Sequence, residues 1–154
     1  MDGTGDLEGL EVLSEAECLG LLARGCVGRV GFNVGGRPVV LPVNYAADEF
    51  GVVVFRTSAS SLLTAVAHQP VAFEIDGVDT VHRTGWSVAV QGDATELTEL
   101  GTPGVDRLRS MPVVTWAPGQ RDRWFAITPE LVTGRRLPVH GLDAGGGWYE
   151  GILG

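Results

Sequence analysis

Three short apolar runs in succession, residues 26–34, 38–45 and 51–57, most constrain what this chain can fold into. Each run is rich in valine, and Gly35-Gly36 stands in the first connection between them. Apolar runs of this length that are separated by tight turn residues are typical of antiparallel β hairpins. The sequence therefore predicts a three-stranded meander within a fold built mainly from β structure.

One proline refines this prediction. Pro42 lies inside the second run, and proline has no N–H group for a sheet ladder, so an edge strand, a bulge or a barrel corner is expected there.

Further strands are expected at residues 71–76 and 86–97, with Gly92 as a bulge or bend. The last strand is expected at residues 124–127, closed by Thr128-Pro129, with 130–137 as a short extended or turn segment. About six short antiparallel strands of this kind predict a small barrel of the α+β class.

Helices are expected to cover the barrel. Ser14 and Glu17 have the spacing of a capping box, so a helix should begin after Ser14 and end at Gly25. A second helix should begin at about Ser61 and end near Pro70, which cannot continue it. Residues 104–109 suit a third, short helix.

A polar turn after the third strand carries the clearest functional signal. Residues 56–61, RTSASS, hold one cation and four hydroxyl groups. Hydroxyls, backbone N–H groups and the start of a helix together favour an anion such as phosphate, with Arg56, Thr57 and Ser61 as candidate ligands. The alternative is that these hydroxyls only cap a surface helix, because serine is a common N-cap. The residues alone leave both interpretations open.

Composition limits the classes of partner. The chain has 154 residues, a net charge of −8 and a pI near 4.7. This charge argues against nucleic acid or an anionic membrane as a partner.

We expect one domain at 13–137, a flexible lead-in at 1–12 and a glycine-rich tail at 138–154. The N-terminus lacks a signal pattern and Cys18 and Cys26 suit small buried thiols, so we expect a cytoplasmic protein. The three histidines are scattered, and no metal site is expected.

Several motifs then occur in a familiar order. They are the capped helix, P-V-N-Y at 42–45, F-R-T-(x)3-S at 55–61, H-x-P-V-A-F-E at 68–74 and G-W-S-V at 85–88. This series resembles the pyridoxamine 5′-phosphate oxidase-like FMN-binding split barrels, in particular their small bacterial branch. The resemblance covers roughly residues 13–97 and 124–137.

The resemblance implies a six-stranded antiparallel split β-barrel with short covering helices. It also implies a homodimer that binds flavin mononucleotide (FMN) between its subunits and acts as an oxidoreductase on a small molecule. The implied contacts are Val43 and Asn44 at the flavin ring, Arg56, Thr57 and Ser61 at the phosphate, Trp86 and Ser87 at the ring or ribityl side, and Arg136, beside Arg135, closing the site from the partner subunit.

One departure from the family pattern leaves other interpretations of the ligand site and of the function open. Relatives usually place a lysine or arginine just after the serine of the phosphate turn, where this chain has Leu62 and Leu63. The site could therefore be weak, empty or suited to a deazaflavin, and the protein could be a flavin- or anion-binding module without turnover, such as a carrier, a sensor or a vestigial domain. Asn44 could instead satisfy backbone groups near Pro42, and Trp86 could simply anchor the barrel rim.

Overall fold

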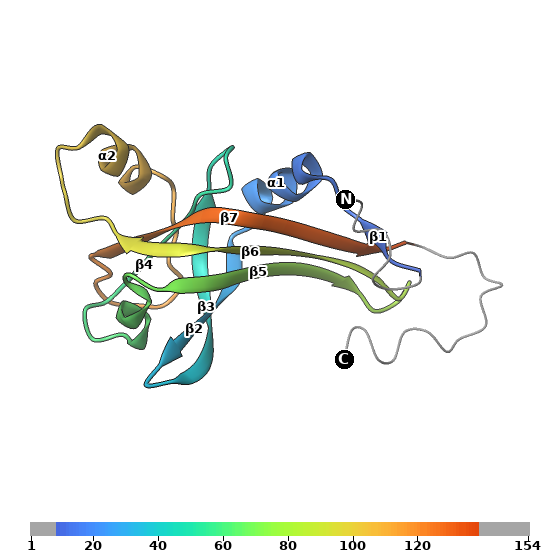
Figure 1. The fold of residues 1–154 in the computed structure, drawn as a ribbon, viewed down its shortest axis with the longest axis horizontal. Coiled ribbons are helices and arrows are strands. Elements are labelled where there is room, and N and C mark those ends of the chain that lie inside the picture. The colour runs from blue at the N-terminus through green and yellow to red at the C-terminus, as the bar shows by residue number, and fades with distance from the viewer. Residues whose placement is uncertain (1–8, 139–154) are drawn as a thin grey trace.

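A computed structural model describes residues 9–138 of the chain, so most of the expected lead-in and nearly all of the tail lie outside the described residues. Its six long strands form an antiparallel sheet in the order β7-β4-β3-β2-β5-β6, and β6 also pairs with β7. This last pairing closes the sheet on itself, which confirms the predicted six-stranded barrel (Figure 1). The strands are β2 (Val27–Val34), β3 (Arg37–Ala47), β4 (Val53–Thr57), β5 (Pro70–Asp79), β6 (Thr84–Glu96) and β7 (Arg123–Leu137).

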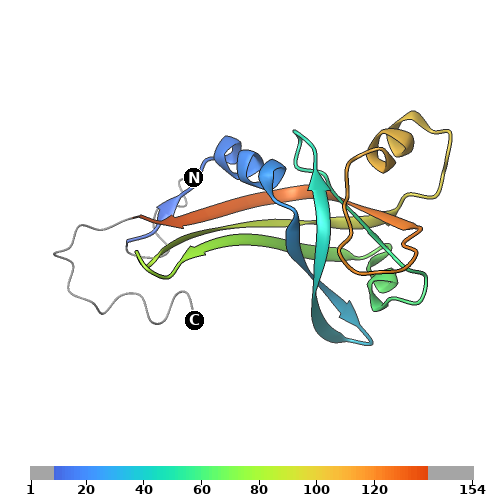
Figure 2. The ribbon, with the colours of Figure 1, turned by 180° about the vertical axis from the view of Figure 1, so that it is seen from behind.

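A seventh, very short strand extends the sheet. Strand β1 (Glu11–Val12), at the end of the expected lead-in, pairs antiparallel with Arg136 and Arg135 of β7. Helix α1 (Glu15–Arg24) follows and packs over β7, β3 and β6 (Figure 2). Its capping box is present as predicted, because Ser14 Oγ accepts from Glu17 N at 3.2 Å and Glu17 Oε2 accepts from Ser14 N at 3.0 Å.

The prediction for the last strand was wrong. Strand β7 does not end at Thr128-Pro129 but continues through Pro129 to Leu137. Pro129 lies opposite Gly92, where the register between β6 and β7 shifts, so its missing N–H falls at an irregularity in the ladder. A Cβ on Gly92 would lie 1.9 Å from the Thr128 carbonyl oxygen, so only glycine leaves room for β7 to pass. The expected bulge at Gly92 is therefore confirmed, and it makes the long strand possible.

Pro42 lies on an open edge, as one of its alternatives predicted. It pairs with Arg29 of β2, whereas β3 pairs with β4 only through residues 45–47. Its other side therefore needs no backbone donor. At the end of the same motif, Tyr45 is buried and donates its hydroxyl to Leu22 O of α1 at 2.8 Å. Burial raises the pKa of Tyr45 to about 12, so this residue fastens α1 to the barrel as a neutral phenol.

The barrel is filled by the inward side chains of alternating positions. Phe55, Phe73 and Phe125 are fully buried, and the rings of Phe55 and Phe125 stack with their centroids 5.6 Å apart. A second, smaller cluster lies outside the barrel, where Val54 and Ala126 pack against residues of helix α2 (Pro103–Arg109). This second core fixes α2 against the outer face of β4 and β7.

Two local expectations need correction. The second helix is not an α-helix to Pro70 but a 3-10 helix, η1 (Leu62–Val66), because His68 adopts a left-handed φ of 62° and Pro70 already begins β5. Cys18 is buried as expected, but Cys26 is exposed, and the two thiols are free.

Candidate functional site

The polar turn begins with two side chains on opposite sides of β4. Thr57 follows Phe55 in pointing into the barrel, whereas Arg56 shares the outer face with Val54. Thr57 is only 1% exposed, and its Oγ1 has no hydrogen-bond partner among the described residues. An unpaired buried hydroxyl is unfavourable unless another group satisfies it. Thr57 therefore offers a donor at the turn, but one that a ligand reaches only if the turn moves.

Arg56 is held in one orientation by two contacts. Its Nε donates to the backbone carbonyl of Arg121 at 2.9 Å, and its guanidinium carbon lies 4.9 Å from the centre of the Trp124 ring. Within residues 9–138 its two terminal nitrogens make no hydrogen bond and no acidic side chain pairs with it. The geometry therefore fixes a cation whose remaining N–H groups can face an anion.

The serines of the turn have a structural role as well. Ser61 caps η1, with its Oγ accepting from Leu63 N at 3.1 Å, and the Ser58 and Ser60 hydroxyls lie 3.4 Å apart. The capping interpretation is thus confirmed for Ser61, but a hydroxyl that accepts one bond can still donate its own proton. Since η1 has only five residues, its dipole adds little, and the hydroxyls and Arg56 are the main donors for an anion.

Leu62 and Leu63, which replace the basic positions of the resembled family, have different environments. Leu62 is 48% exposed, whereas Leu63 is 8% exposed and belongs to the barrel core. Of these two positions, only 62 can therefore present a side chain outward.

The two residues expected at a flavin ring lie on opposite faces of β3. Val43 points into the core and is 7% exposed. Asn44 is half-buried on the outer face; its Oδ1 accepts from Trp116 N at 2.8 Å, and its Nδ2 donates to Cys26 O at 3.4 Å. Asn44 therefore ties down the loop of residues 110–122, which joins α2 to β7. It bonds backbone groups, but those of Trp116 and Cys26 and not, as the alternative expected, groups near Pro42.

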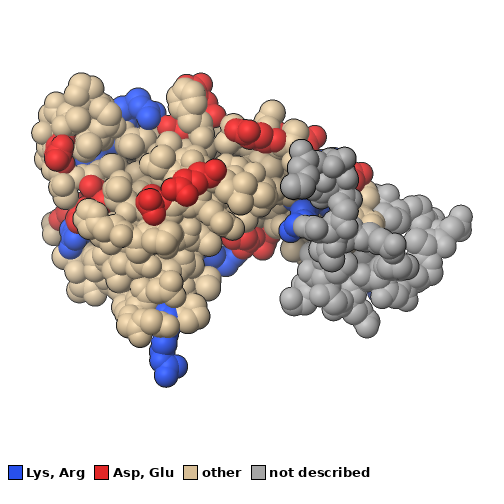
Figure 3. Space-filling view, in the orientation of Figure 1, with Lys and Arg blue, Asp and Glu red and all other residues tan. Residues whose placement is uncertain are grey.

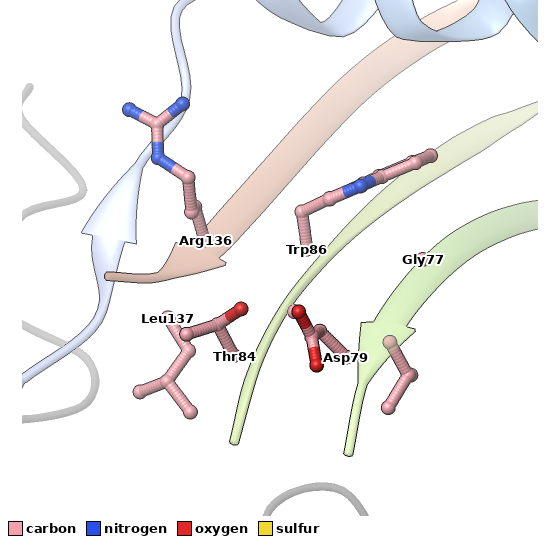
Figure 4. A pocket seen from close by; sticks show the side chains of 8 residues that line it. Gly77, Asp79, Thr84, Trp86, Arg136 and Leu137 are labelled. Atoms are coloured by element: carbon pink, nitrogen blue, oxygen red, sulfur yellow. The ribbon is translucent and has the colours of Figure 1, made fainter. Parts of the chain in front are cut away.

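The other expected residues meet at the far end of the barrel. Trp86 and Arg136 are directly paired across β6 and β7, and both line a pocket of about 390 Å³ with Gly77, Asp79, Thr84 and Leu137. Figure 4 shows Trp86 and Arg136 projecting to the same side of the two strands. The Trp86 ring packs over Gly77, where a Cβ would meet the indole at 2.6 Å. Arg136 Nη2 forms a salt bridge with Glu11 Oε2 of β1 at 2.8 Å. Ser87 is exposed on the opposite face of β6.

The candidate residues thus form two groups within one subunit. Arg56 pairs with Trp124 at one end of β7, and Arg136 follows Trp124 by twelve residues along the same strand. At about 3.3 Å per residue, this separation is roughly 40 Å. A single mononucleotide cannot contact both groups within one subunit.

Three residues near Arg56 were not predicted as site residues from the sequence. Arg56 contacts Trp124 of β7 and Arg121 of the 110–122 loop only in the folded chain. Arg109 of α2 contacts the same indole ring. The guanidinium carbon of Arg109 lies 5.5 Å from the centre of the Trp124 ring, and its Nη1 donates to Leu97 O at 2.9 Å. The aromatic pair Trp124-Phe125 near the start of β7 was the local signal in the sequence.

A neighbouring arginine is neutralised in a way that Arg56 is not. Arg123 makes a two-pronged contact with the Glu96 carboxylate, including Nη2 to Oε2 at 2.7 Å. This hydrogen bonding lowers the pKa of Glu96, so the pair stays ionised at neutral pH. Figure 3 shows acidic side chains dispersed over the face that it draws. Arg56 has no such carboxylate partner among residues 9–138, so its charge is not neutralised by a neighbouring acid.

The donor set of this end of the barrel fits a phosphate group. Arg56 and Ser61 supply N–H and O–H donors at the end of β4, and a phosphate oxygen accepts charge-assisted hydrogen bonds from such groups. Among residues 9–138 no three His, Cys, Asp or Glu side chains are arranged to hold a metal ion. No helix in the described part of the chain is long and apolar enough to cross a membrane.

Known proteins resemble this chain in sequence and in fold. The chain is 34% identical over 131 residues to an uncharacterized protein of Mycobacterium tuberculosis, covering 81% of this chain and 84% of that one. Its fold is similar to the FAD binding protein of Mycobacterium smegmatis, with a TM-score of 0.68 and 28% identity over 83% of this chain and 100% of that chain. It is also similar to a FAD-binding protein of Mesorhizobium loti, with a TM-score of 0.68 and 26% identity over 84% of this chain and 99% of that chain. The family model for pyridoxamine 5′-phosphate oxidase matches residues 14–136, and the chain therefore belongs to this family of split-barrel proteins.

Proposed function

We propose that the protein is a homodimer that binds FMN between its subunits and uses it to oxidise or reduce a small molecule. The observation that carries this proposal is Arg56, a cation with no acidic partner among the described residues, fixed beside a hydroxyl-rich turn in a chain of this family. When bound, a flavin accepts or donates a hydride or single electrons. The protein's own contribution is to hold, orient and shield it.

The phosphate end follows from the donors at the turn. Arg56 keeps its Nε on the Arg121 carbonyl and presents its terminal N–H groups to the phosphate, while the Ser61 hydroxyl adds a shorter-range donor. Because these contacts are made before the ligand arrives, little ordering entropy is lost on binding. The flavin ring would then extend along the outer face of β3 toward Asn44.

The case for a dimer rests on the two separated groups of candidate residues. Trp86 and Arg136 lie at the opposite end of β7 from Arg56, so they can reach the same ligand only from a second subunit. A two-fold dimer that places the far end of one barrel against the turn of the other would complete the site twice.

The first test is the mass of the purified protein with and without FMN. We expect light scattering at micromolar concentration to give about twice the 16.2 kDa of one chain. We also expect the dimer to be yellow, with a flavin absorption band that remains after gel filtration. A monomer that nevertheless retains stoichiometric flavin would rule out the intersubunit site.

A second test restores the basic residue that the turn lacks. Leu62→Lys should tighten FMN binding by about tenfold at low salt, since a charge-assisted hydrogen bond contributes about 1.5–3 kcal/mol before screening. Leu62 is 48% exposed, so the substitution should leave the melting temperature nearly unchanged.

The neighbouring position supplies the matched control. Leu63→Lys places a charge in the barrel core and should lower the melting temperature instead of raising affinity. If Leu62→Lys is stable and its affinity for FMN is unchanged, the turn is not the phosphate site.

A second candidate function is flavin binding without turnover. It is favoured by Leu62 and Leu63 in place of a basic residue, and the two solved relatives are described by their binding of FAD and not by a reaction. The experiment that distinguishes an enzyme from a binding module is anaerobic reduction of the bound flavin by NADH or NADPH, followed by reoxidation with added electron acceptors. An enzyme completes both half-reactions repeatedly, whereas a carrier or sensor does not. A colourless protein that takes up neither FMN nor FAD but binds a reduced or oxidised deazaflavin would point to that cofactor.

A further inference from the structure

We propose that two copies of this chain pair through the outer face of β5, β6 and β7, with their strands antiparallel across a two-fold axis at Gln91. The partner is a second copy of the chain, so this inference rests on the homodimer of the proposed function. It goes further because it names the face, the position of the axis and a residue that each copy contributes to the other's site.

The two faces of this three-stranded layer have opposite character. Its inward side chains, such as Phe73 and Val90, are fully buried in the barrel. Its outward side chains alternate with these, and Ala72 and Gln91, which are paired across β5 and β6, are exposed. The outward side chains of β7 over residues 131–135 are exposed as well. The long outer face is therefore open to solvent in a single chain.

The middle row of this face carries no charge. The row continues over β2 to β3, and each of its five residues is paired with the next: Leu131, Gln91, Ala72, Gly31 and Val40. Val40 is 64% exposed and Leu131 is 50% exposed, and the other three residues line a groove of about 390 Å³ together with Val40. The centres of protein interfaces are depleted of charged residues, whereas a strand face that stays in water is normally polar. In a chain of net charge −8, this row has the composition of an interface centre.

The position of this row fits an axis that joins the two separated groups of candidate residues. Leu97, six residues after Gln91, donates its N–H to Trp124 O at 2.8 Å. Since Trp124 pairs with Arg56, this position after β6 is level with the polar turn. Six residues before Gln91, strand β6 carries the start of the G-W-S-V motif, residues 85–88. An axis at Gln91 that reverses the strands therefore places this motif of one copy level with Arg56 of the other.

The residue that each copy contributes on this face is Ser87. It is outward and exposed, four residues from Gln91, so its hydroxyl points toward the copy whose Arg56 lies at the same level. Trp86 and Arg136 arrive at the same end on the other side of these strands. A hydroxyl offers both a donor and an acceptor to a ligand held at the other copy's turn. The pairing therefore completes each site with a group that a single chain cannot supply there.

Strand β3 offers a different surface for a second copy, which is its open edge. Tyr45 N donates to Cys26 O on the β2 side, so the alternate positions Pro42 and Pro38 turn toward the open edge. Proline has no N–H group, and these positions cannot donate to an added strand. Pairing through the outer face is therefore favoured over pairing edge to edge.

The first test is Leu131→Glu, which places a carboxylate from each copy next to the axis. We expect it to weaken the dimer by at least about hundredfold, because like charges brought together in an interface are strongly unfavourable. Light scattering at micromolar concentration should then give the 16.2 kDa of one chain, and circular dichroism should show a folded barrel, since Leu131 is half exposed. Leu100→Glu is the matched control. It makes the same substitution at a leucine that is 68% exposed between β6 and α2, and it should leave the dimer intact.

The second test does not require the interface to be disrupted. Gln91→Cys, in a chain that also carries Cys26→Ser, places one thiol from each copy beside the axis, while Cys18 is buried. A bismaleimide that spans about 10 Å, the separation of packed sheets, should link two such chains. Thr95→Cys in the same background is the control, because Thr95 is exposed on the same strand four residues further on. Its two copies would lie about 26 Å apart along the strands, and they should not be linked.

The outcomes separate this inference from the proposed function. If Leu131→Glu stays a dimer, or if Gln91→Cys is not linked, the inference is overturned whether or not the protein binds flavin. If Leu131→Glu does not fold, the linking of Gln91→Cys decides alone. If both tests succeed but the dimer takes up no added FMN, the pairing face stands and the proposed function falls.

Discussion

Arg56→Ala is expected to weaken FMN binding by about ten- to hundredfold, the effect of removing a charged hydrogen-bonding partner worth about 1.5–3 kcal/mol. Riboflavin, which has no phosphate, should lose less than about threefold. Arg56 lies over Trp124 with its Nε bonded to the Arg121 carbonyl, so its removal deletes the cation and one bond to the 110–122 loop but leaves the backbone pairing of β4 in place. Quenching of flavin fluorescence on titration measures both affinities.

The control for this variant is Arg37→Ala. Arg37 is an exposed arginine of the β2–β3 hairpin, so its loss removes one positive charge away from the turn. It should leave both affinities unchanged at physiological salt, where the Debye length is about 8 Å. If Arg56→Ala weakens FMN and riboflavin equally, Arg56 acts through folding and not through the phosphate.

Gly92→Ala is expected to lower the free energy of unfolding by about 2–3 kcal/mol, as for other substitutions that overpack an interior. A Cβ at this position would lie 1.9 Å from the Thr128 carbonyl oxygen, which belongs to the backbone and cannot rotate away. The seam between β6 and β7 must therefore open locally. For a chain of this size, thermal unfolding should occur about 4–12 °C lower.

Gly20→Ala is the matched control for that experiment. Gly20 lies inside α1, and a Cβ there meets nothing within 4 Å. Alanine should stabilise the helix by about 0.5–1 kcal/mol, because it restricts the unfolded chain. If Gly92→Ala unfolded at the wild-type temperature, the bulge at Gly92 would not be what closes the barrel.

The parts of the fold that could be predicted depend on neighbours in sequence. The capping box of Ser14 and Glu17 involves residues three apart, and Pro42 marks an open edge through its own missing donor. The course of β7 could not be predicted in this way. Pro129 looks like a strand end until Gly92, from another strand, is known to lie opposite it. Long-range pairing therefore overrode the local signal.

The same distinction between local and long-range contacts applies to the candidate site. The turn of Arg56, Thr57 and Ser61 is contiguous, so its chemistry was visible in the sequence. Whether each side chain faces the core or the outside depends on the register of β4, and this places Thr57 and Arg56 on opposite faces. Arg109 and Trp124 were not recognised, because the contacts that join them to Arg56 come from three separate segments.

The 110–122 loop has a kinetic consequence. Its backbone is bonded at Trp116 N to Asn44 Oδ1 and at Arg121 O to Arg56 Nε, so it spans the groups expected at the two ends of a bound flavin. Arg56 can keep its bond while its terminal N–H groups bind a ligand, but a ligand that takes over Asn44 Oδ1 must first break the bond from Trp116 N. The rates of ligand binding and release would then be limited by detachment of this loop, which is a unimolecular step. The observed association rate should therefore level off at high ligand concentration. The amide proton of Trp116 would report the same step through its rate of exchange with solvent.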